Sequence, residues 1–236
     1  MRIRHVMAGV TVVATGLLLS ACDWGELGDK KFTDSESLSG PVSEVRFTND
    51  SGNVKVTAGD AIEIRRTVGY HDTKPGKTYR MDGGALVFEA CPERNCWVAY
   101  EVTVPKGTKV SGRLDSGDIE IAGLAGANVE ASSGNVTVRD VEGEVNAKTE
   151  SGNVQMWSIG GPVVAGAESG NITVALDQPR GVAATTSSGN VTVTVPAGSY
   201  HVRLHGDLVS DAVGDDGTGP SIDLRTDSGD ITLNSA

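Results

Sequence analysis

The chain has 236 residues, of which 31 are glycine and only 4% are aromatic, a composition that disfavours helices and favours many turns joined by thin strands. Its formal charge is −11, and without residues 1–21 it becomes −13, because 18 basic side chains then stand against 31 acidic ones. Such a surface repels phosphate backbones, so we exclude nucleic acid as a partner.

The N-terminus has the layout of a secretory signal peptide. A basic start, Arg2–His5, precedes an apolar run, Val6–Leu19, that is shorter than the roughly 20 residues a membrane-spanning helix needs. Leu19-Ser20-Ala21-Cys22 resembles a lipobox, in which a peptidase accepts the small residues and the thiol of Cys22 accepts a diacylglyceryl group. We expect a signal peptide over residues 1–21 and a protein lipid-anchored at Cys22 to the cell membrane, on its extracytoplasmic face. The alternative is a plain secretion signal.

The segment that follows Cys22 is polar. Asp23 resembles a signal for retention at the inner membrane in bacteria with two membranes. Residues 22–41 have many charges and little apolar periodicity, which predicts a flexible tether between the lipid and a folded domain over residues 42–236.

In the first part of that domain, from Val42 to Val110, apolar and polar residues alternate irregularly around turn residues. The last alternating run ends in Pro105-Lys106-Gly107. We expect hairpins that cap a repeat array. Within it, Cys91 and Cys96 are an even pair left over once Cys22 holds lipid. A tight loop outside the cytoplasm favours a structural disulfide, with a redox-active pair or a metal site as weaker alternatives.

One short sequence motif, the repeat phrase, recurs through the domain. It consists of Ser-Gly-Asn or Ser-Gly-Asp, followed by an apolar residue, any residue and a second apolar residue. Between Ser116 and Ser188 its spacing is 17, 18, 18 and 19 residues, and the last gap of 40 predicts two longer or irregular turns. The phrase begins at Ser51, Ser116, Ser133, Ser151, Ser169, Ser188 and Ser228.

Alternating residues flank each phrase, such as Val145, Ala147 and Thr149 before Ser151 and Val154 and Met156 after it. Each repeat is therefore strand, sharp turn, strand and looser turn, and its glycine should have a positive φ. Two strands bury little alone, but stacked repeats bury a continuous core. The pattern predicts an all-β fold, a parallel β-solenoid with coils of about 17–20 residues.

Stacking would align the third residue of every phrase in a ladder along one edge. These polar side chains could bind a glycan or Ca²⁺, or they could be turn residues that bond their own backbone. The ladder consists of Asn53, Asp118, Asn135, Asn153, Asn171, Asn190 and Asp230.

Other candidate sites are weaker. Asp207, Asp211, Asp215 and Asp216 lie in a glycine-rich segment, where a solvated acidic loop is favoured over a Ca²⁺ site. His201 and His205 would share one face of a strand, but a third metal ligand is missing. Trp157 could stack on a sugar, or could cover the core or an edge. We predict no metal site and no cofactor.

With these residues in view, the chain resembles a bacterial family of adhesin-like proteins with β-strand repeats and no known function. The likeness rests on the Ser-Gly-Asn/Asp phrases, on Val-Thr-Val-Pro-Lys-Gly at 102–107 and on Val-Pro-Ala-Gly at 195–198, and it spans residues 42–234. It implies a fold but no catalytic residues. We therefore expect a surface binding or adhesion module for a glycan. The alternative is an envelope scaffold or sensor with an envelope protein as partner, and a polysaccharide-active enzyme ranks third.

Overall fold

The structure is a computed structural model, and it describes residues 30–236. These residues form 19 β-strands and no α-helix, so nothing in this part of the chain spans a membrane as a helix. The strands are β1 Lys30–Leu38, β2 Glu44–Ser51, β3 Val54–Ala58, β4 Ile62–Tyr70, β5 Tyr79–Asp82, β6 Ala85–Phe88, β7 Cys96–Val104, β8 Lys109–Ser116, β9 Ile119–Ala122, β10 Gly126–Ser133, β11 Val136–Val141, β12 Val145–Ser151, β13 Val154–Ile159, β14 Val163–Ser169, β15 Ile172–Ala175, β16 Val182–Ser188, β17 Val191–Val195, β18 His201–Asp211 and β19 Ser221–Ser235.

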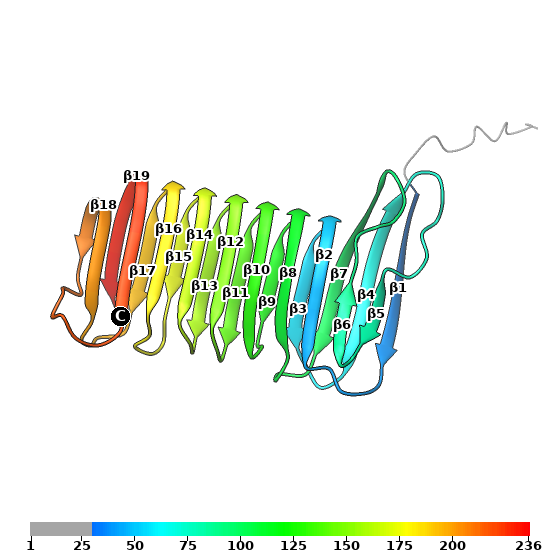
Figure 1. The fold of residues 1–236 in the computed structure, drawn as a ribbon, viewed down its shortest axis with the longest axis horizontal. Helices are drawn as coiled ribbons and strands as arrows, with labels where there is room; N and C mark the ends of the chain where they lie inside the picture. Colours follow the sequence, from blue (N-terminus) through cyan, green and yellow to red (C-terminus); the bar gives the residue numbers. More distant parts are fainter. Residues whose placement is uncertain (1–29) are drawn as a thin grey trace, which may run out of the picture.

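The strands form two facing layers (Figure 1). The first sheet contains the strands that precede each repeat phrase, and β8, β10, β12, β14 and β16 pair there in parallel. The second sheet contains the strands that follow the phrase, and β9, β11, β13, β15 and β17 pair there in parallel. Valine, isoleucine and alanine side chains from both sheets fill one continuous core between them. The predicted parallel β-solenoid is confirmed.

Each coil turns from the first sheet to the second at its Ser-Gly-Asn/Asp phrase. The seven glycines of the phrase have φ between +108° and +154°, as the sequence predicts. Consecutive phrases are in register, so that Ser133, Ser151, Ser169 and Ser188 are neighbours across parallel strands. The interior is narrow because its inward positions are mostly valine and alanine, which explains why the chain needs few aromatic residues.

The N-terminal end departs from chain order. After β2 and β3 the chain runs outward, and β6 and β7 pair with β2 and β3 on the side away from β8 and β9. Two antiparallel strands, β4 and β1, then extend the second sheet, and β5 adds to β6 as an antiparallel hairpin. The predicted cap of hairpins is therefore present, and it covers the end of the core with Phe88 and Tyr100, whose ring centroids are 4.6 Å apart.

The C-terminal end also departs from chain order. The gap of 40 positions from Ser188 to Ser228 holds β18 and the first half of β19, but these are not stacked in sequence, because Ser188 pairs directly with Ser228. Strand β18 instead lies outside β19 and pairs with both of its halves, with two register shifts. The outermost strand thus comes first in the chain, and the strand that lies between it and the rest of the solenoid comes afterwards, as at the N-terminal end.

The predicted tether over residues 22–41 is wrong for the part that the structure describes. Residues Lys30–Leu38 form strand β1, which pairs with β4 over its whole length. The segment lacks apolar alternation because two of its half-buried positions are acidic: the guanidinium of Arg66, itself buried, donates to both oxygens of Asp34 at 2.8 and 2.9 Å. Tyr79 Oη donates to Glu36 at 2.7 Å. Residues 22–29, including Cys22 and Asp23, and the signal peptide lie outside the described residues.

The hydrogen-bonded acidic residues of β1 make the stability of the fold depend on pH. Lysine 77 and the Tyr79 hydroxyl both bond Glu36 and hold its pKa below the ordinary 4.5. A carboxyl whose pKa is lower in the folded state adds stability above its unfolded pKa, and that stability is lost as the pH falls. We expect the melting temperature to drop below about pH 4.5, and to drop less in Glu36→Gln, in thermal unfolding followed by circular dichroism. An identical drop in both proteins would contradict this assignment.

The predicted disulfide is formed between Cys91 and Cys96, whose Cα atoms are 5.9 Å apart. It closes the loop between β6 and β7, where Asn95 has a φ of 54°. The bond therefore fastens the connection between β6 and β7 in the N-terminal cap.

Candidate functional site

The asparagine and aspartate ladder is aligned as predicted, but Oδ1 of every member except Asp230 already has a partner. Asn153 Oδ1 accepts from the backbone N–H of Asn171 at 2.9 Å, and Asn171 Oδ1 accepts from Asn190 N–H at 2.8 Å. The same bond recurs six times without a break, from the Asn53 side chain to the backbone of Asp230. The side chains therefore bond the backbone of the next coil and not their own.

A second row supports the same turns from inside. Buried Thr149, Thr186 and Thr226 each donate a hydroxyl hydrogen bond to a glycine carbonyl of the neighbouring coil, at 2.9 to 3.0 Å. The polar ladder thus holds the coils in register, because it satisfies backbone groups that a sharp turn would leave unpaired. Whether it also binds a ligand stays a prediction.

We expect Asn153→Ala to lower the free energy of unfolding by about 1–2 kcal/mol, since it leaves the Asn171 N–H without its acceptor. Asn153→Asp keeps that acceptor and should cost less. Urea unfolding compares the two, with Gln155→Ala as the control on the same strand. Equal losses in all three variants would contradict a structural role for the ladder.

The acidic segment is organised by its own backbone. Asp211 Oδ1 accepts from Val213 and Gly214 N–H, and Asp215 Oδ1 accepts from Val202 and Gly217 N–H. Asp216 Oδ1 likewise accepts from Thr218 N–H at 3.0 Å. The N–H bonds of Gly217 and Val202 lower the pKa of Asp215. The hydrogen bond from the Ser199 side chain, followed by that from Thr218 N–H, lowers the pKa of Asp216. No group of three metal-ligating side chains gathers anywhere in residues 30–236.

The two histidines do share the outer face of β18, as predicted. His201 Nδ1 lies 3.5 Å from Asp215 Oδ1, and His205 pairs in register with Arg225. An arginine beside His205 disfavours a bound cation, so this pair does not define a metal site.

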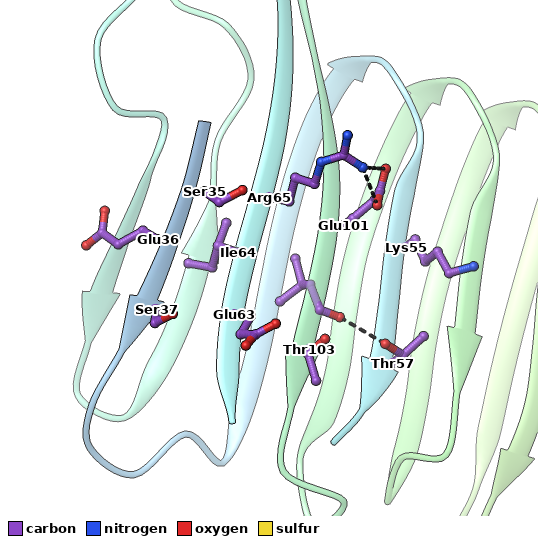
Figure 2. Close-up of a pocket in the computed structure, with 11 residues that line it drawn as sticks. Ser35, Glu36, Ser37, Lys55, Thr57, Glu63, Ile64, Arg65, Glu101 and Thr103 are labelled. Atoms are coloured by element: carbon purple, nitrogen blue, oxygen red, sulfur yellow. Dashed lines mark hydrogen bonds and ion pairs between the residues drawn. The ribbon is translucent and has the colours of Figure 1, made fainter. Parts of the chain in front are cut away.

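One hollow lies on the outer face of the second sheet, near the N-terminal cap (Figure 2). Its volume is about 420 Å³, and its lining comes from β1, β3, β4 and β7. Figure 2 shows Arg65 reaching Glu101. The Arg65 guanidinium donates to a Glu101 carboxylate oxygen at 3.1 Å. Lys55 bonds Glu120 of the next coil at 2.9 Å. Arg65, Glu101 and Lys55 thus form exposed ion pairs, which leaves the carboxylate of Glu63 and several Ser and Thr hydroxyls along the groove between them.

Further along the same outer face, the charged outward side chains end at β11, with Arg139 and Asp140. A shallower hollow of about 400 Å³ lies beside the ladder and includes Glu120, Thr137 and Gln155. Beyond it, the outward positions of β13, β15, β17 and the second half of β19 hold only hydroxyl, amide, methyl and indole groups. We name this set the uncharged face: Gln155, Trp157, Thr173, Ala175, Thr192, Thr194, Thr232 and Asn234.

Trp157 is the one large apolar side chain of the uncharged face. It is 38% exposed, which settles the alternative left open by the sequence: the ring points outward and does not fill the core. Its neighbours in register are Arg139 on β11 and Ala175 on β15. The indole ring thus lies between the small methyl group of Ala175 and the guanidinium of Arg139, and it stays accessible beside polar groups.

Sequence reasoning singled out Trp157 but missed the face around it. The signal was present in the repeat itself, because the fourth and sixth residues after each repeat serine point outward. These positions hold Thr192 and Thr194 in one coil and Thr232 and Asn234 in the next. Sequence reasoning also missed Leu208 and Val209 of β18, which are 53% and 65% exposed at the C-terminal end.

The fold and the ladder together define a class, the parallel β-solenoids built from short two-strand repeats. The chain belongs to the Toastrack DUF4097 family, whose model matches residues 39–234. A search of curated proteins gives no match. The family resemblance seen in the repeat phrases is therefore confirmed.

The chain is also distantly similar to solved structures. A putative cell adhesion protein from Clostridium sporogenes is 14% identical with a TM-score of 0.44, covering 88% of this chain and 100% of that one. A putative adhesin from Bacteroides fragilis is 12% identical with a TM-score of 0.46, covering 88% and 97%. One from Parabacteroides distasonis is 11% identical with a TM-score of 0.40, also covering 88% and 97%.

Proposed function

We propose that this chain is a lipoprotein of the cell surface that displays a rigid β-solenoid as a binding module. The observation that carries the proposal is the uncharged face: a flat, ordered array of hydroxyl and amide groups around exposed Trp157. Such a surface has no role in the core or in the ladder. It is suited to recognising a partner, because its side chains stand on paired strands and are held in fixed positions.

The anchor comes from the sequence Leu19-Ser20-Ala21-Cys22. Each buried methylene of an acyl chain adds roughly 0.8 kcal/mol of membrane affinity, so two or three chains on Cys22 would hold the protein durably. The Cys91–Cys96 disulfide supports a location outside the cytoplasm, where such bonds persist.

Cell fractionation tests the anchor. We expect the unmodified chain in the membrane fraction and Cys22→Ala in the soluble or secreted fraction. A matched variant, Cys91→Ser with Cys96→Ser, should remain in the membrane fraction, because it leaves the acceptor thiol intact. Membrane association that survives Cys22→Ala would overturn the lipid anchor.

A second candidate function is an envelope scaffold or sensor with a protein partner. It is favoured by the C-terminal end, where Leu208 and Val209 are exposed and β18 pairs, among residues 30–236, with β19 alone. Replacing both with serine should abolish capture of an envelope protein by the chain and leave ligand binding at the uncharged face unchanged. If capture persists in that variant, the β18 edge is not the docking site.

A further inference from the structure

We infer that the uncharged face is a carbohydrate site, and that its ligand is an uncharged oligosaccharide that stacks one sugar ring on Trp157. The inference rests on the proposed display function and names the ligand class of its binding face. It depends on three features of the described residues, namely an open indole ring, unoccupied hydroxyl and amide groups, and the absence of charge.

The indole supplies the apolar contact. The C–H groups of a sugar ring form a weakly apolar face that packs on an aromatic ring, and tryptophan gives the largest such surface. Trp157 is more than one third exposed, and the cation–π contacts within residues 30–236 involve Trp97, Phe32 and Tyr79, so none of them covers it. Ala175 in the next coil is too small to shield it.

Polar groups lie beside the ring in a straight row. Gln155, two residues before Trp157 on β13, pairs in register with Thr173, and Thr173 pairs with Thr192. In the hydrogen-bond network of residues 30–236, these three side chains have no protein partner. A hydroxyl both donates and accepts, and so does a carboxamide, which suits them to sugar hydroxyls.

The charge distribution selects an uncharged ligand. Residues 109–236 hold 7 basic and 17 acidic side chains, a formal charge of −10, yet the uncharged face holds none of them. The first sheet of the same coils carries Lys148, Glu150, Glu168 and others on its outer side. An anionic polymer would be repelled by the overall field, and a cationic partner would find its complement on the first sheet.

Titration of the mature chain carrying Cys22→Ser, which keeps it free of lipid, tests the inference. The probes are chitotetraose, cellotetraose and maltotetraose, with alginate as the anionic polymer and calorimetry and tryptophan fluorescence as readouts. We expect saturable binding of at least one tetrasaccharide, with a Kd at or below about 1 mM, and no binding of alginate. Trp157→Ala should weaken binding at least tenfold, while Trp157→Phe should retain most of it.

The matched control is Trp97→Ala, which removes the indole of the cap and should leave saccharide affinity unchanged. Circular dichroism and a melting curve establish that each variant is folded. Three outcomes would each overturn the inference: no tetrasaccharide binds at millimolar concentration, Trp157→Ala binds as well as the parent, or alginate is the preferred ligand. The titration uses lipid-free protein, so its failure is separate from a failure of the Cys22 anchor.

Discussion

Gly170→Ala is expected to destabilise the protein by about 3 kcal/mol or more, and at a working temperature near 37 °C to leave a large unfolded fraction. Gly170 has a φ of +154°, and a Cβ there would collide with the carbonyl oxygen of Gly152 in the preceding coil. The coil that contains Gly152 cannot move away, because its own turn is hydrogen-bonded to the coil before it. Both the backbone strain and the collision therefore remain in the folded state.

Urea unfolding measures the loss, with Gly107→Ala as the matched control. Gly107 lies in the turn before β8, its φ is not positive, and nothing lies within 4 Å of an added Cβ. We expect the control to change stability by less than about 1 kcal/mol. If the two substitutions cost the same, the stacked turns do not have the close approach described above.

Ile172→Ala is expected to cost about 2–5 kcal/mol, the range for removing a buried isoleucine side chain. Ile172 is fully buried and lies in register between Val154 and Val191, so the cavity it leaves is lined by coils that the ladder holds in place. The adjacent outward residue gives the control: Thr173→Ala should change stability by no more than about 0.5 kcal/mol. Chemical denaturation of both variants checks the difference, and a loss below about 1 kcal/mol for Ile172→Ala would contradict a tightly stacked core.

The repeat region could be predicted because every coil has the same sequence pattern. Alternating residues such as Val145 and Ala147, a glycine with positive φ and a polar third residue recur at nearly constant spacing, so strand, turn and parallel register follow from local pattern alone. The disulfide followed from a short loop with two cysteines. Trp157 was a candidate from the same pattern, although only the structure shows that its ring points outward.

The ends of the solenoid could not be predicted, because long-range pairing decides them. Strand β1 has acidic residues at half-buried positions, and only the distant Arg66 makes Asp34 acceptable there. Strand β18 has no repeat phrase, and its place outside β19 depends on which strand fills the gap beside β17. The uncharged face was within reach of the sequence, because its residues occupy the fourth and sixth positions after the repeat serines, but only the alignment of neighbouring coils joins them into one surface.

The order of strands at the C-terminal end is the most direct test of this architecture, and cysteine pairs introduced into the Cys22→Ser chain measure it. Thr192 and Thr232 are neighbours across β17 and β19, and Ser210 and Thr232 are neighbours across β18 and β19. Strands pair at about 4.8 Å, so mild oxidation should join Thr192→Cys to Thr232→Cys and Ser210→Cys to Thr232→Cys. Thr192 and Ser210 lie two strands apart, about 9.6 Å, and their cysteine pair should stay reduced. A rapid disulfide between those two positions, with none between Thr192→Cys and Thr232→Cys, would contradict the account.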